Sequence, residues 1–379
     1  MAGRRRRLLK DMNMQSNQRF HIAVLPGDGI GHEVMAPCLR LLTAAAQRCG
    51  GFGLDWDEKP AGAMTYKETG TALPPDTMAT ARRADAILLG AKGLPSIRYP
   101  DGTEIAPQLD LRFNLGLYAG LRPVRVLPGM TPLLADPRAA TIDFVLIRES
   151  TEGLFASRGK GTITDDREAR DTMLITRGVS ERLFDFSFAL AATRKRQGRP
   201  GVVTCVDKAN VFTSFAFFRK IFHERAALNP SLGNECAYVD AMALFMLRRP
   251  WDLDVLVTEN MFGDILSDLG AGLMGGLGFA PSADIGDSHA VFQPCHGTAP
   301  DIAGQGRANP VAMFLSGAMM LEWLAEKHAL PEAARAGALV RAAIDTALAA
   351  GARPMETGGT LGTLALTEAV LAAMETLPA

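Results

Sequence analysis

Apolar residues along the 379-residue chain follow two alternating patterns. Short runs rich in β-branched and aliphatic residues predict strands over residues 21–25, 85–89, 142–147, 202–206 and 254–258. Longer segments with apolar residues three and four positions apart predict helices over residues 31–47, 180–196, 212–225, 235–247, 310–327 and 331–350. Strands that alternate with helices in this way indicate an α/β fold with a mostly parallel sheet.

Several helix starts are marked by residue type. Ser180, followed by Glu181 and Arg182, suits a capped first turn. Pro310 and Pro331 suit first helical positions, because proline lacks the N–H group that this position leaves unpaired.

Length and composition narrow the class of protein. At about 150 residues per domain the chain has room for two or three units, although no repeat or linker marks a boundary. Hydrophobic residues make up 47% and charged residues 21%, which is enough apolar material for a sizeable core. The net charge of −1 argues against non-specific binding to nucleic acid or to an anionic membrane.

Local features of the sequence bear on targeting, on membrane crossing and on disulfide formation. The Arg-rich start of the chain lacks the apolar segment of a secretory signal, and we expect residues 1–19 to be a disordered, solvated basic tail. The longest uncharged stretch, residues 269–283, is about 15 residues long, short of the roughly 20 apolar residues that a membrane span needs. Five widely spaced cysteines form no CxxC pair, which favours a reducing cytoplasm over a disulfide framework or a zinc site.

A glycine-rich turn, Leu25-Pro-Gly-Asp-Gly-Ile-Gly31, follows the first predicted strand. It invites a dinucleotide-binding interpretation, but its glycines miss the G-x-G-x-x-G spacing and Asp28 would place a negative charge against phosphates. The alternative is a tight strand-to-helix turn that needs glycine backbone angles.

Two aspartates form the most specific local signal. Asp264 and Asp268, in Thr258-Glu-Asn-Met-Phe-Gly-Asp-Ile-Leu-Ser-Asp268, lie four residues apart on one face of a predicted helix. Two like charges at this spacing repel, and a hard cation such as Mg²⁺ or Mn²⁺ would neutralise them. The plainer interpretation is that aspartates favour a helix N-terminus.

Basic residues cluster at the ends of predicted elements. Arg112, Arg122 and Arg148 could grip carboxylates through paired hydrogen bonds, although a single surface arginine is usually just solvated. Lys208 follows a short apolar strand and is a candidate base if a cation lies nearby. The Gly- and Pro-rich loop 294–310 suggests a backbone shaped around a ligand.

Taken together, these segments resemble the β-decarboxylating dehydrogenases of (R)-2-hydroxyacids, the family of isopropylmalate, isocitrate, homoisocitrate, tartrate and D-malate dehydrogenases. The resemblance runs from about residue 22 to residue 371 and rests on LPGDGIG, the arginines with LRP, VDKANV, ENMFGDILSD and HGTAPDIAG in the family's order. It implies a two-lobed isopropylmalate dehydrogenase-like fold distinct from a Rossmann fold. One lobe would comprise residues 20–117 and 276–379 and bind the cofactor, and a smaller lobe, residues 118–275, would form the dimer interface.

The resemblance also assigns roles to residues. Arg112, Arg122 and Arg148 would hold the malate carboxylates, with Asn210 nearby, and Lys208 would be the catalytic lysine. Asp264 and Asp268 would bind Mg²⁺ or Mn²⁺ together with Asp240 from the neighbouring subunit of a homodimer. The adenosine half of NAD would lie in a loop formed by His296, Gly297, Thr298, Ala299, Pro300, Asp301, Ile302, Gly304 and Asn309.

Cofactor preference follows from charge. Asp301 matches an acidic residue that accepts the ribose hydroxyls of NAD, and a carboxylate about 4 Å from a 2′-phosphate would oppose NADP by several kcal/mol. NAD is therefore expected. Arg307 lies in the same loop and could instead reach a phosphate.

One position departs from the family pattern. Phe155 stands where most relatives carry the tyrosine that donates a proton after decarboxylation, and phenylalanine has no proton to donate. Either another group supplies the proton while Phe155 keeps the packing, or the chemistry is altered.

The resemblance points to a malate-type dicarboxylate as substrate. The segment before Arg112 should face the variable group of the substrate, with Ile105 and Leu109 as an apolar wall and Gln108 as a polar contact. We expect NAD- and metal-dependent oxidation of D-malate, tartrate or 3-isopropylmalate. The alternatives are isocitrate or homoisocitrate, a non-catalytic regulatory homologue, and a metal-free Rossmann dehydrogenase.

Overall fold

The computed structural model of the chain describes residues 18–378. Most of the predicted basic tail lies outside these residues, but its last two positions belong to strand β1 (Gln18–Gly27). The correction has a simple cause. Arg19 forms an ion pair with Asp55, and Phe20 is buried in the core, so both side chains anchor the start of the strand.

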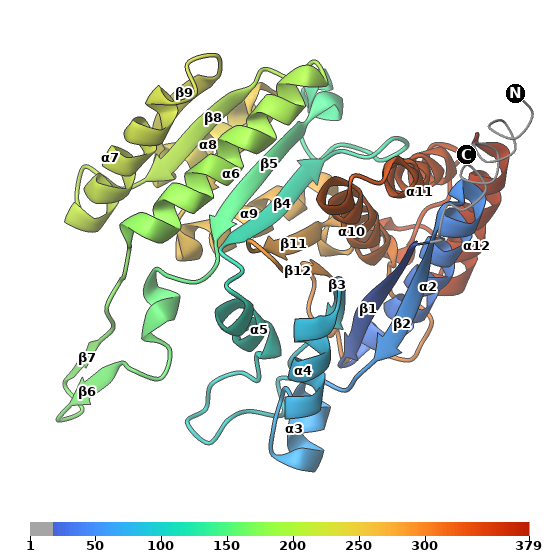
Figure 1. Cartoon of the computed structure of the whole chain (residues 1–379), viewed down its shortest axis with the longest axis horizontal. Coiled ribbons are helices and arrows are strands. Elements are labelled where there is room, and N and C mark those ends of the chain that lie inside the picture. The colour runs from blue at the N-terminus through green and yellow to red at the C-terminus, as the bar shows by residue number, and fades with distance from the viewer. Residues whose placement is uncertain (1–17, 379) are drawn as a thin grey trace, which may run out of the picture.

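One sheet of ten strands organises the molecule (Figure 1). Its order is β2 (Phe52–Glu58), β1, β3 (Ala86–Ala91), β12 (Ala290–Pro294), β11 (Pro281–Ile285), β4 (Ala119–Arg125), β5 (Asp143–Glu149), β10 (Val255–Thr258), β8 (Val202–Asp207) and β9 (Gly233–Tyr238). Neighbouring strands run parallel except for β12 with β11, β11 with β4, and β4 with β5. Two parallel halves are thus joined by antiparallel strands, and the predicted α/β architecture is confirmed.

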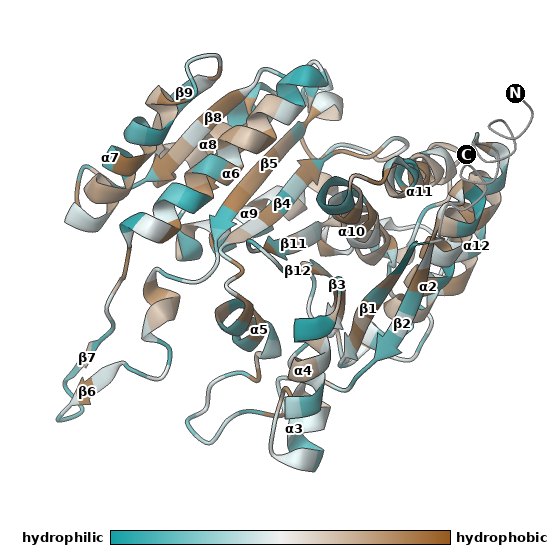
Figure 2. Ribbon diagram, in the orientation of Figure 1, coloured by the Kyte–Doolittle hydropathy of each residue, from teal (hydrophilic) through white to brown (hydrophobic). Residues whose placement is uncertain are grey.

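Helices pack against both halves of the sheet. Beside the first half lie α2 (Ile30–Cys49), α3 (Ala63–Thr69), α4 (Pro75–Arg83), α10 (Val311–His328), α11 (Pro331–Ala349) and α12 (Thr363–Thr376). Beside the second half lie α6 (Arg177–Arg196), α7 (Thr213–Ala227), α8 (Val239–Arg248) and α9 (Asn260–Met274), while α5 (Pro107–Leu115) lies between the halves. Strands β5 and β8 are apolar, as expected for strands covered on both faces, whereas the edge strand β2 is largely hydrophilic (Figure 2).

The five predicted strands and most predicted helices are confirmed, with two corrections. The predicted helix over 235–247 is wrong in its first part, because residues 233–238 pair in parallel with β8 as strand β9, and the helix begins only at Val239. Helix α6 begins at Arg177, and Thr176 accepts a hydrogen bond from the backbone N–H of Val179 at 3.5 Å. Ser180 is therefore not the cap, and its buried hydroxyl donates to Thr176 O at 2.7 Å.

The glycine-rich turn after β1 is a structural turn. Gly27 and Gly29 have positive φ angles of 80° and 53°, and a Cβ on Gly29 would lie 2.3 Å from Thr298 O. The carboxylate of Asp28 accepts hydrogen bonds from the backbone N–H groups of Ala63 at 2.7 Å and Met64 at 2.9 Å, at the start of α3. The tight-turn interpretation is therefore correct, and the Asp28 carboxylate is bound by the N-terminus of α3.

The path of the chain fits two lobes. It passes from the first half of the sheet to the second between α5 and β4, and it returns between α9 and β11. These crossings lie near the predicted boundaries at 117/118 and 275/276, which stay a prediction. A small hairpin, β6 (Thr162–Thr164) with β7 (Glu168–Arg170), projects from the second half (Figure 1). Among the helices of residues 18–378, none combines the length and apolar character that crossing a membrane requires.

Candidate active site

Three buried arginines line one cavity at the junction of the two halves. Arg112 comes from α5, Arg122 from β4 and Arg148 from the carboxyl end of β5, and each is at most 5% exposed. The cavity has a volume of about 350 Å³, and Asp264 and Asp268 of α9 also line it. The structure therefore brings together these five side chains, which the sequence singled out from four separate segments.

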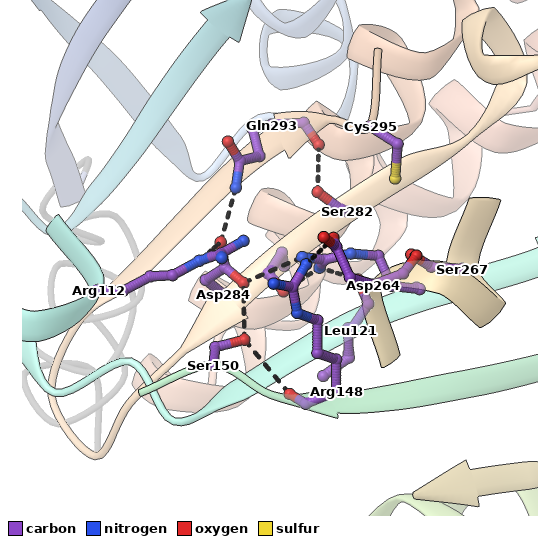
Figure 3. A network of polar contacts seen from close by, with 12 residues as sticks. Arg112, Leu121, Arg148, Ser150, Asp264, Ser267, Ser282, Asp284, Gln293 and Cys295 are labelled. Carbon is purple, nitrogen blue, oxygen red and sulfur yellow. Dashed lines mark hydrogen bonds and ion pairs between the residues drawn. The ribbon is translucent and has the colours of Figure 1, made fainter. Parts of the chain in front are cut away.

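A buried carboxylate, Asp284 of β11, organises two of the arginines (Figure 3). Its Oδ2 accepts from Arg112 Nε at 3.0 Å, and its Oδ1 accepts from Arg122 Nη2 at 3.3 Å. Gln293 Nε2 also donates to Oδ2, at 2.6 Å. Burial disfavours the charged form of Asp284, but the arginines, Arg112 first, more than offset this effect and hold the pKa of its carboxyl below the usual range. Asp284 is thus the anion that lets guanidinium groups lie close together.

Backbone pairing fixes this arrangement. Gly120 of β4 lies opposite both Asp284 of β11 and Arg148 of β5. A Cβ on Gly120 would lie 2.6 Å from Ser150 Oγ and 3.1 Å from Asp284 Oδ1. The bare backbone of Gly120 therefore leaves the space that the Asp284 carboxylate occupies.

Arg148 is held by α9. Its Nε and Nη2 donate to Asn260 Oδ1 at 2.9 and 2.7 Å, and its Nη1 forms an ion pair with Asp264. A Cβ on Gly263 would lie 2.6 Å from Arg148 Cβ, so glycine at this position allows the close approach. Burial, and then the charge of Arg112, lower the pKa of Arg148 to about 10, so the side chain is still cationic near neutral pH.

The paired aspartates suit a hard divalent cation. Burial and the neighbouring charge of Asp264 raise the pKa of Asp268, although Asp264 itself is paired with Arg148. Mg²⁺ and Mn²⁺ prefer such oxygen ligands and usually keep several waters. Within one chain, residues 18–378 contain no group of three or more His, Cys, Asp or Glu residues placed to hold a metal. Asp264 and Asp268 would therefore be two of the ligands of such a cation.

Lys208 and Asp240 lie elsewhere in the same chain. Lys208 follows β8, two strands away from β5, and its Nζ lies 2.6 Å from Asp240 Oδ1. Asp240 begins α8 with 67% of its side chain exposed, and Asn210 is also exposed. None of the three lines the arginine-containing cavity of its own chain.

The predicted wall for the variable group is correct only in part. Gln108, Leu109 and Phe155 line the cavity, and the Phe155 ring lies 5.0 Å from Arg148 Cζ. Ile105 does not line it, because its side chain packs into a small separate core with Ala63 and neighbouring residues. The polar side chains of Thr103 and Glu104 line the cavity from the same segment.

A second cavity of about 480 Å³ lies along the loop after β12. Five of the predicted cofactor residues line it, namely His296, Gly297, Ala299, Ile302 and Asn309. The other four do not: Thr298 is buried and donates to Gly93 O at 2.7 Å, the N–H of Gly304 donates to Glu33, and Pro300 and Asp301 are exposed.

The second cavity combines an unpaired polar atom with apolar walls. His296 Nε2 is buried without a hydrogen-bond partner among residues 18–378, although Nδ1 lies 2.9 Å from Gly297 O. Apolar walls of Ile30, Leu277 and Met355 suit the faces of a base. An unpaired buried nitrogen beside such walls fits a ligand that brings its own polar groups, as the adenosine of NAD does.

Among the cavity residues that sequence reasoning missed, four make hydrogen bonds that shape the cavities. Asp284, Gln293 and Lys92 belong to the first cavity or its hydrogen bonds, and Glu356 lines the second. Glu356 Oε2 accepts from Asn309 Nδ2 at 2.8 Å, and Oε1 accepts from the N–H of Gly278 at 3.0 Å. In the sequence these four stand out only as isolated polar residues. Where their side chains point depends on how segments far apart in the chain pack together.

Comparison with known proteins places the whole chain among dehydrogenases. Residues 21–371 match the model of the isocitrate/isopropylmalate dehydrogenase family. The 3-isopropylmalate/3-methylmalate dehydrogenase of Methanocaldococcus jannaschii is 41% identical over 350 residues, which cover 92% of this chain and 97% of that protein. The 3-isopropylmalate dehydrogenase of Anaeromyxobacter dehalogenans is 40% identical over 359 residues, covering 92% and 98%.

Solved structures agree with this similarity. An isocitrate dehydrogenase from Methylococcus capsulatus has a TM-score of 0.80 and 34% identity, over 94% of this chain and 99% of its own. A β-decarboxylating dehydrogenase from Thermococcus kodakarensis, solved without ligand, has a TM-score of 0.76 and 34% identity, over 94% and 96%. Sequence and fold thus agree along nearly the whole length of the chain.

Proposed function

The chain belongs to the isocitrate/isopropylmalate dehydrogenase family, and from this premise we propose that it oxidises a malate-type (R)-2-hydroxy diacid with NAD and a divalent metal, usually with decarboxylation. The observation that carries the proposal is the buried arginine cluster beside two aspartates. Arg112 and Arg122 share one buried counter-ion, Asp284, whereas Arg148 pairs with Asp264. A dianionic substrate would supply the negative charge that the cluster lacks.

The residues of the two cavities suit a divalent cation and NAD. Asp264 and Asp268 would hold Mg²⁺ or Mn²⁺, and the loop around His296 and Asn309 would hold the adenosine half of NAD. When bound, the cation stabilises negative charge that develops on the substrate oxygen, and the nicotinamide accepts a hydride. The arginines bind and orient the carboxylates, and their burial keeps the reacting end of the substrate away from bulk water.

A homodimer would complete the site. Lys208 and the exposed Asp240 lie outside the cavity of their own chain, and exposed apolar residues lie on the neighbouring helices α8 and α9. In the proposed dimer, Lys208 of one subunit helps to take the hydroxyl proton in the site of the other. Asp240 of the same subunit supplies the third carboxylate for the metal.

The lining of the cavity favours a small or polar variable group. Its apolar side chains from the 103–109 segment are Ala106 and Leu109, while Thr103, Glu104 and Gln108 are polar. The Oε1 atom of Gln108 is buried without a hydrogen-bond partner, which suits a donor on the substrate. D-Malate or tartrate therefore fits better than 3-isopropylmalate. The names of the relatives keep 3-isopropylmalate and 3-methylmalate as candidates.

NAD is proposed over NADP. Asp301 brings a carboxylate to the loop, although its side chain is exposed and does not line the cavity, whereas Arg307 does line it. An ordered cofactor would draw Asp301 to the ribose hydroxyls. The ratio of kcat/KM for the two cofactors tests this assignment, and a preference for NADP would show that Arg307 dominates.

The five cysteines are free in the described part of the chain, which supports the proposal of a cytoplasmic location. Location of the tagged full-length chain by cell fractionation tests this assignment.

A substrate screen tests the proposed activity. Purified protein with NAD and Mn²⁺ is assayed against D-malate, the tartrates, 3-isopropylmalate, isocitrate and homoisocitrate, with NADH and carbon dioxide both measured. We expect NADH formation with a malate-type acid, loss of activity on chelation, and recovery with Mn²⁺. Activity that survives chelation would favour a metal-free dehydrogenase, and no turnover of any of these acids would favour a non-catalytic homologue.

One variant tests the metal site directly. Asp264→Asn should abolish metal-dependent turnover while the protein still folds, because the amide cannot supply the negative charge that the cation needs. Asp252→Asn, at an exposed aspartate away from the cavity, is the matched control and should keep normal activity. Near-normal turnover by Asp264→Asn would refute the assignment.

A further inference from the structure

A lysine from the end of β3 also lines the arginine-containing cavity. Lys92 follows β3, and its Nζ donates to Gln293 Oε1 at 2.7 Å. It lines the same cavity as Arg112, Arg148 and Phe155. The side chain therefore reaches the space in which the proposed substrate would bind.

Lys92 is held by a neutral partner. Gln293 accepts from Lys92 through Oε1 and donates to Asp284 through Nε2 at 2.6 Å, so both ends of its amide are engaged (Figure 3 shows Gln293 and Asp284). The amide positions the ammonium without neutralising it. By contrast, Lys208 forms an ion pair with the carboxylate of Asp240. A neutral amide stabilises the ammonium of Lys92 less than a carboxylate would.

The surroundings also favour proton exchange by Lys92. Burial, and then the charge of Arg112, lower its pKa to about 8, while Asp284 and Cys295 act in the opposite direction and Arg122 adds to the lowering. His296, on the loop after β12, is held neutral by burial, with a pKa of about 4. A group with a pKa near 8 can both give and regain a proton close to neutral pH.

The proposed reaction needs such a donor. After carbon dioxide leaves the oxidised diacid, the resulting enolate must gain a proton on carbon. Phe155 faces the cavity and has no exchangeable proton, and the guanidinium groups hold their protons too tightly. Among the described residues that line the cavity, Cys295 is less suited than Lys92, because burial raises the pKa of its thiol.

We propose that Lys92 is a catalytic residue of this site and donates the proton to the carbon from which carbon dioxide has departed. This inference rests on the proposed function. The Nζ–H bond breaks, and a C–H bond forms with the electron pair of the enolate C=C bond. The enolate oxygen becomes the ketone oxygen, and Lys92 is left as a neutral amine. Oxidation of the substrate releases one hydroxyl proton, and uptake of a proton from solvent by the amine restores the ammonium, so protons balance over the turnover.

Proton exchange in the product isolates this step from hydride transfer. Wild-type protein with Mn²⁺ is incubated in D₂O with pyruvate or with 4-methyl-2-oxopentanoate. Loss of the proton signal next to the ketone is followed by ¹H NMR. We expect wild-type protein to catalyse exchange into one of these 2-oxo acids, and Lys92→Met to slow it by about 100-fold, the range for removal of a general acid–base group. Lys92→Arg keeps the charge but should also be slow.

A second variant separates proton donation from packing. Phe155→Tyr introduced into the Lys92→Met protein should restore at least a tenth of the exchange rate, because a phenol then faces the cavity. Thermal unfolding of each variant reports its folding, and Lys92→Arg serves if Lys92→Met is unfolded. A lysine that only supports the packing would not be replaced by a phenol on another element.

The outcomes distinguish this inference from the proposed function. Exchange by Lys92→Met or Lys92→Arg at the wild-type rate would overturn the role of Lys92, even if wild-type protein forms NADH from a diacid. Formation of NADH and carbon dioxide by wild-type protein without exchange into either 2-oxo acid would overturn it as well. Absence of NADH with every diacid would instead overturn the proposed function, and the role of Lys92 with it.

Discussion

At the scale of single residues, the site depends on one buried anion. Asp284 is 1% exposed and contacts Arg112, Arg122 and Gln293. Its negative charge compensates the positive charge of the two buried arginines. Removal of one partner of a buried ion pair usually costs more than the pair contributes, because the remaining charge is left without compensation.

Asp284→Asn should therefore destabilise the protein strongly. We expect the free energy of unfolding to fall by about 3–5 kcal/mol, measured by denaturant titration near neutral pH. The KM for the diacid should change as well, because Arg112 loses the partner that orients it. Asp55→Asn breaks an exposed pair with Arg19 and should lower the free energy of unfolding far less. An equal decrease in the free energy of unfolding for the two variants would show that Asp284 does not stabilise the arginine cluster.

His296 should make stability depend on pH. Burial lowers its pKa from 6.5 to about 4 in the folded protein. Between these values the unfolded chain binds a proton that the folded protein excludes. The contribution is therefore fully present above pH 6.5 and is lost as the pH falls toward 4. Between pH 7 and pH 4.5, the free energy of unfolding should fall by about 2 kcal/mol less in His296→Gln than in the wild-type protein.

The control is the same substitution at another histidine, His32→Gln, on the exposed surface of α2, and the pH profiles of unfolding of both variants are compared with that of the wild-type protein. A profile for His296→Gln that coincides with wild type would mean that His296 is accessible to protons in the folded protein.

At the scale of elements, α8 and α9 carry apolar residues that the described part of the chain, residues 18–378, leaves exposed. Leu244 and Leu247 of α8 are 51% and 46% exposed, and Ile265 of α9 is 62% exposed, although Met242 and Met246 of α8 are buried. Exposed aliphatic side chains on two helices that contact each other are typical of a subunit interface.

Charge on this surface should separate the proposed dimer. Ile265→Glu and Leu244→Glu should each shift the protein toward a monomer in sedimentation velocity and lower its activity, because burying an unpaired carboxylate is costly. Leu364→Glu, at a residue of α12 that is 67% exposed, is the matched control and should leave the oligomer intact. A wild-type monomer, or dimers of the two interface variants, would contradict this interface.

Strands and helices differed in how well the sequence predicted them. Central strands such as β5 and β8 are covered on both faces, so their continuous apolar runs are visible in the sequence. The edge strand β9 lacks a regular alternation of polar and apolar residues and lies directly before a helix, so only its pairing with β8 separates it from that helix. The three arginines were expected near element ends, but only Arg148 lies near the end of its strand, whereas Arg122 is in the middle of β4. Asp284 and Lys92 were not expected, since only the order of β3, β12 and β11 brings them to the site.

At the scale of the whole molecule, the proposed site belongs to two chains. Each subunit offers a cavity with Arg112, Arg148 and Asp264, and offers Lys208 with Asp240 at a separate place. In a symmetric dimer each of the two sites would take its lysine from the partner. A single chain would then bind a diacid but would lack a complete set of metal ligands and the proposed base.

Mixed dimers test this central claim most directly. Lys208→Ala and Asp264→Asn proteins are each assayed alone, then mixed, allowed to exchange subunits, and assayed again with the best diacid, NAD and Mn²⁺. Each variant alone should be nearly inactive. The mixture should recover about a quarter of wild-type activity, because half of the dimers are mixed and each contains one intact site. No recovery, with mixed dimers verified by native mass spectrometry, would show that both residues serve the same chain and would contradict the shared site.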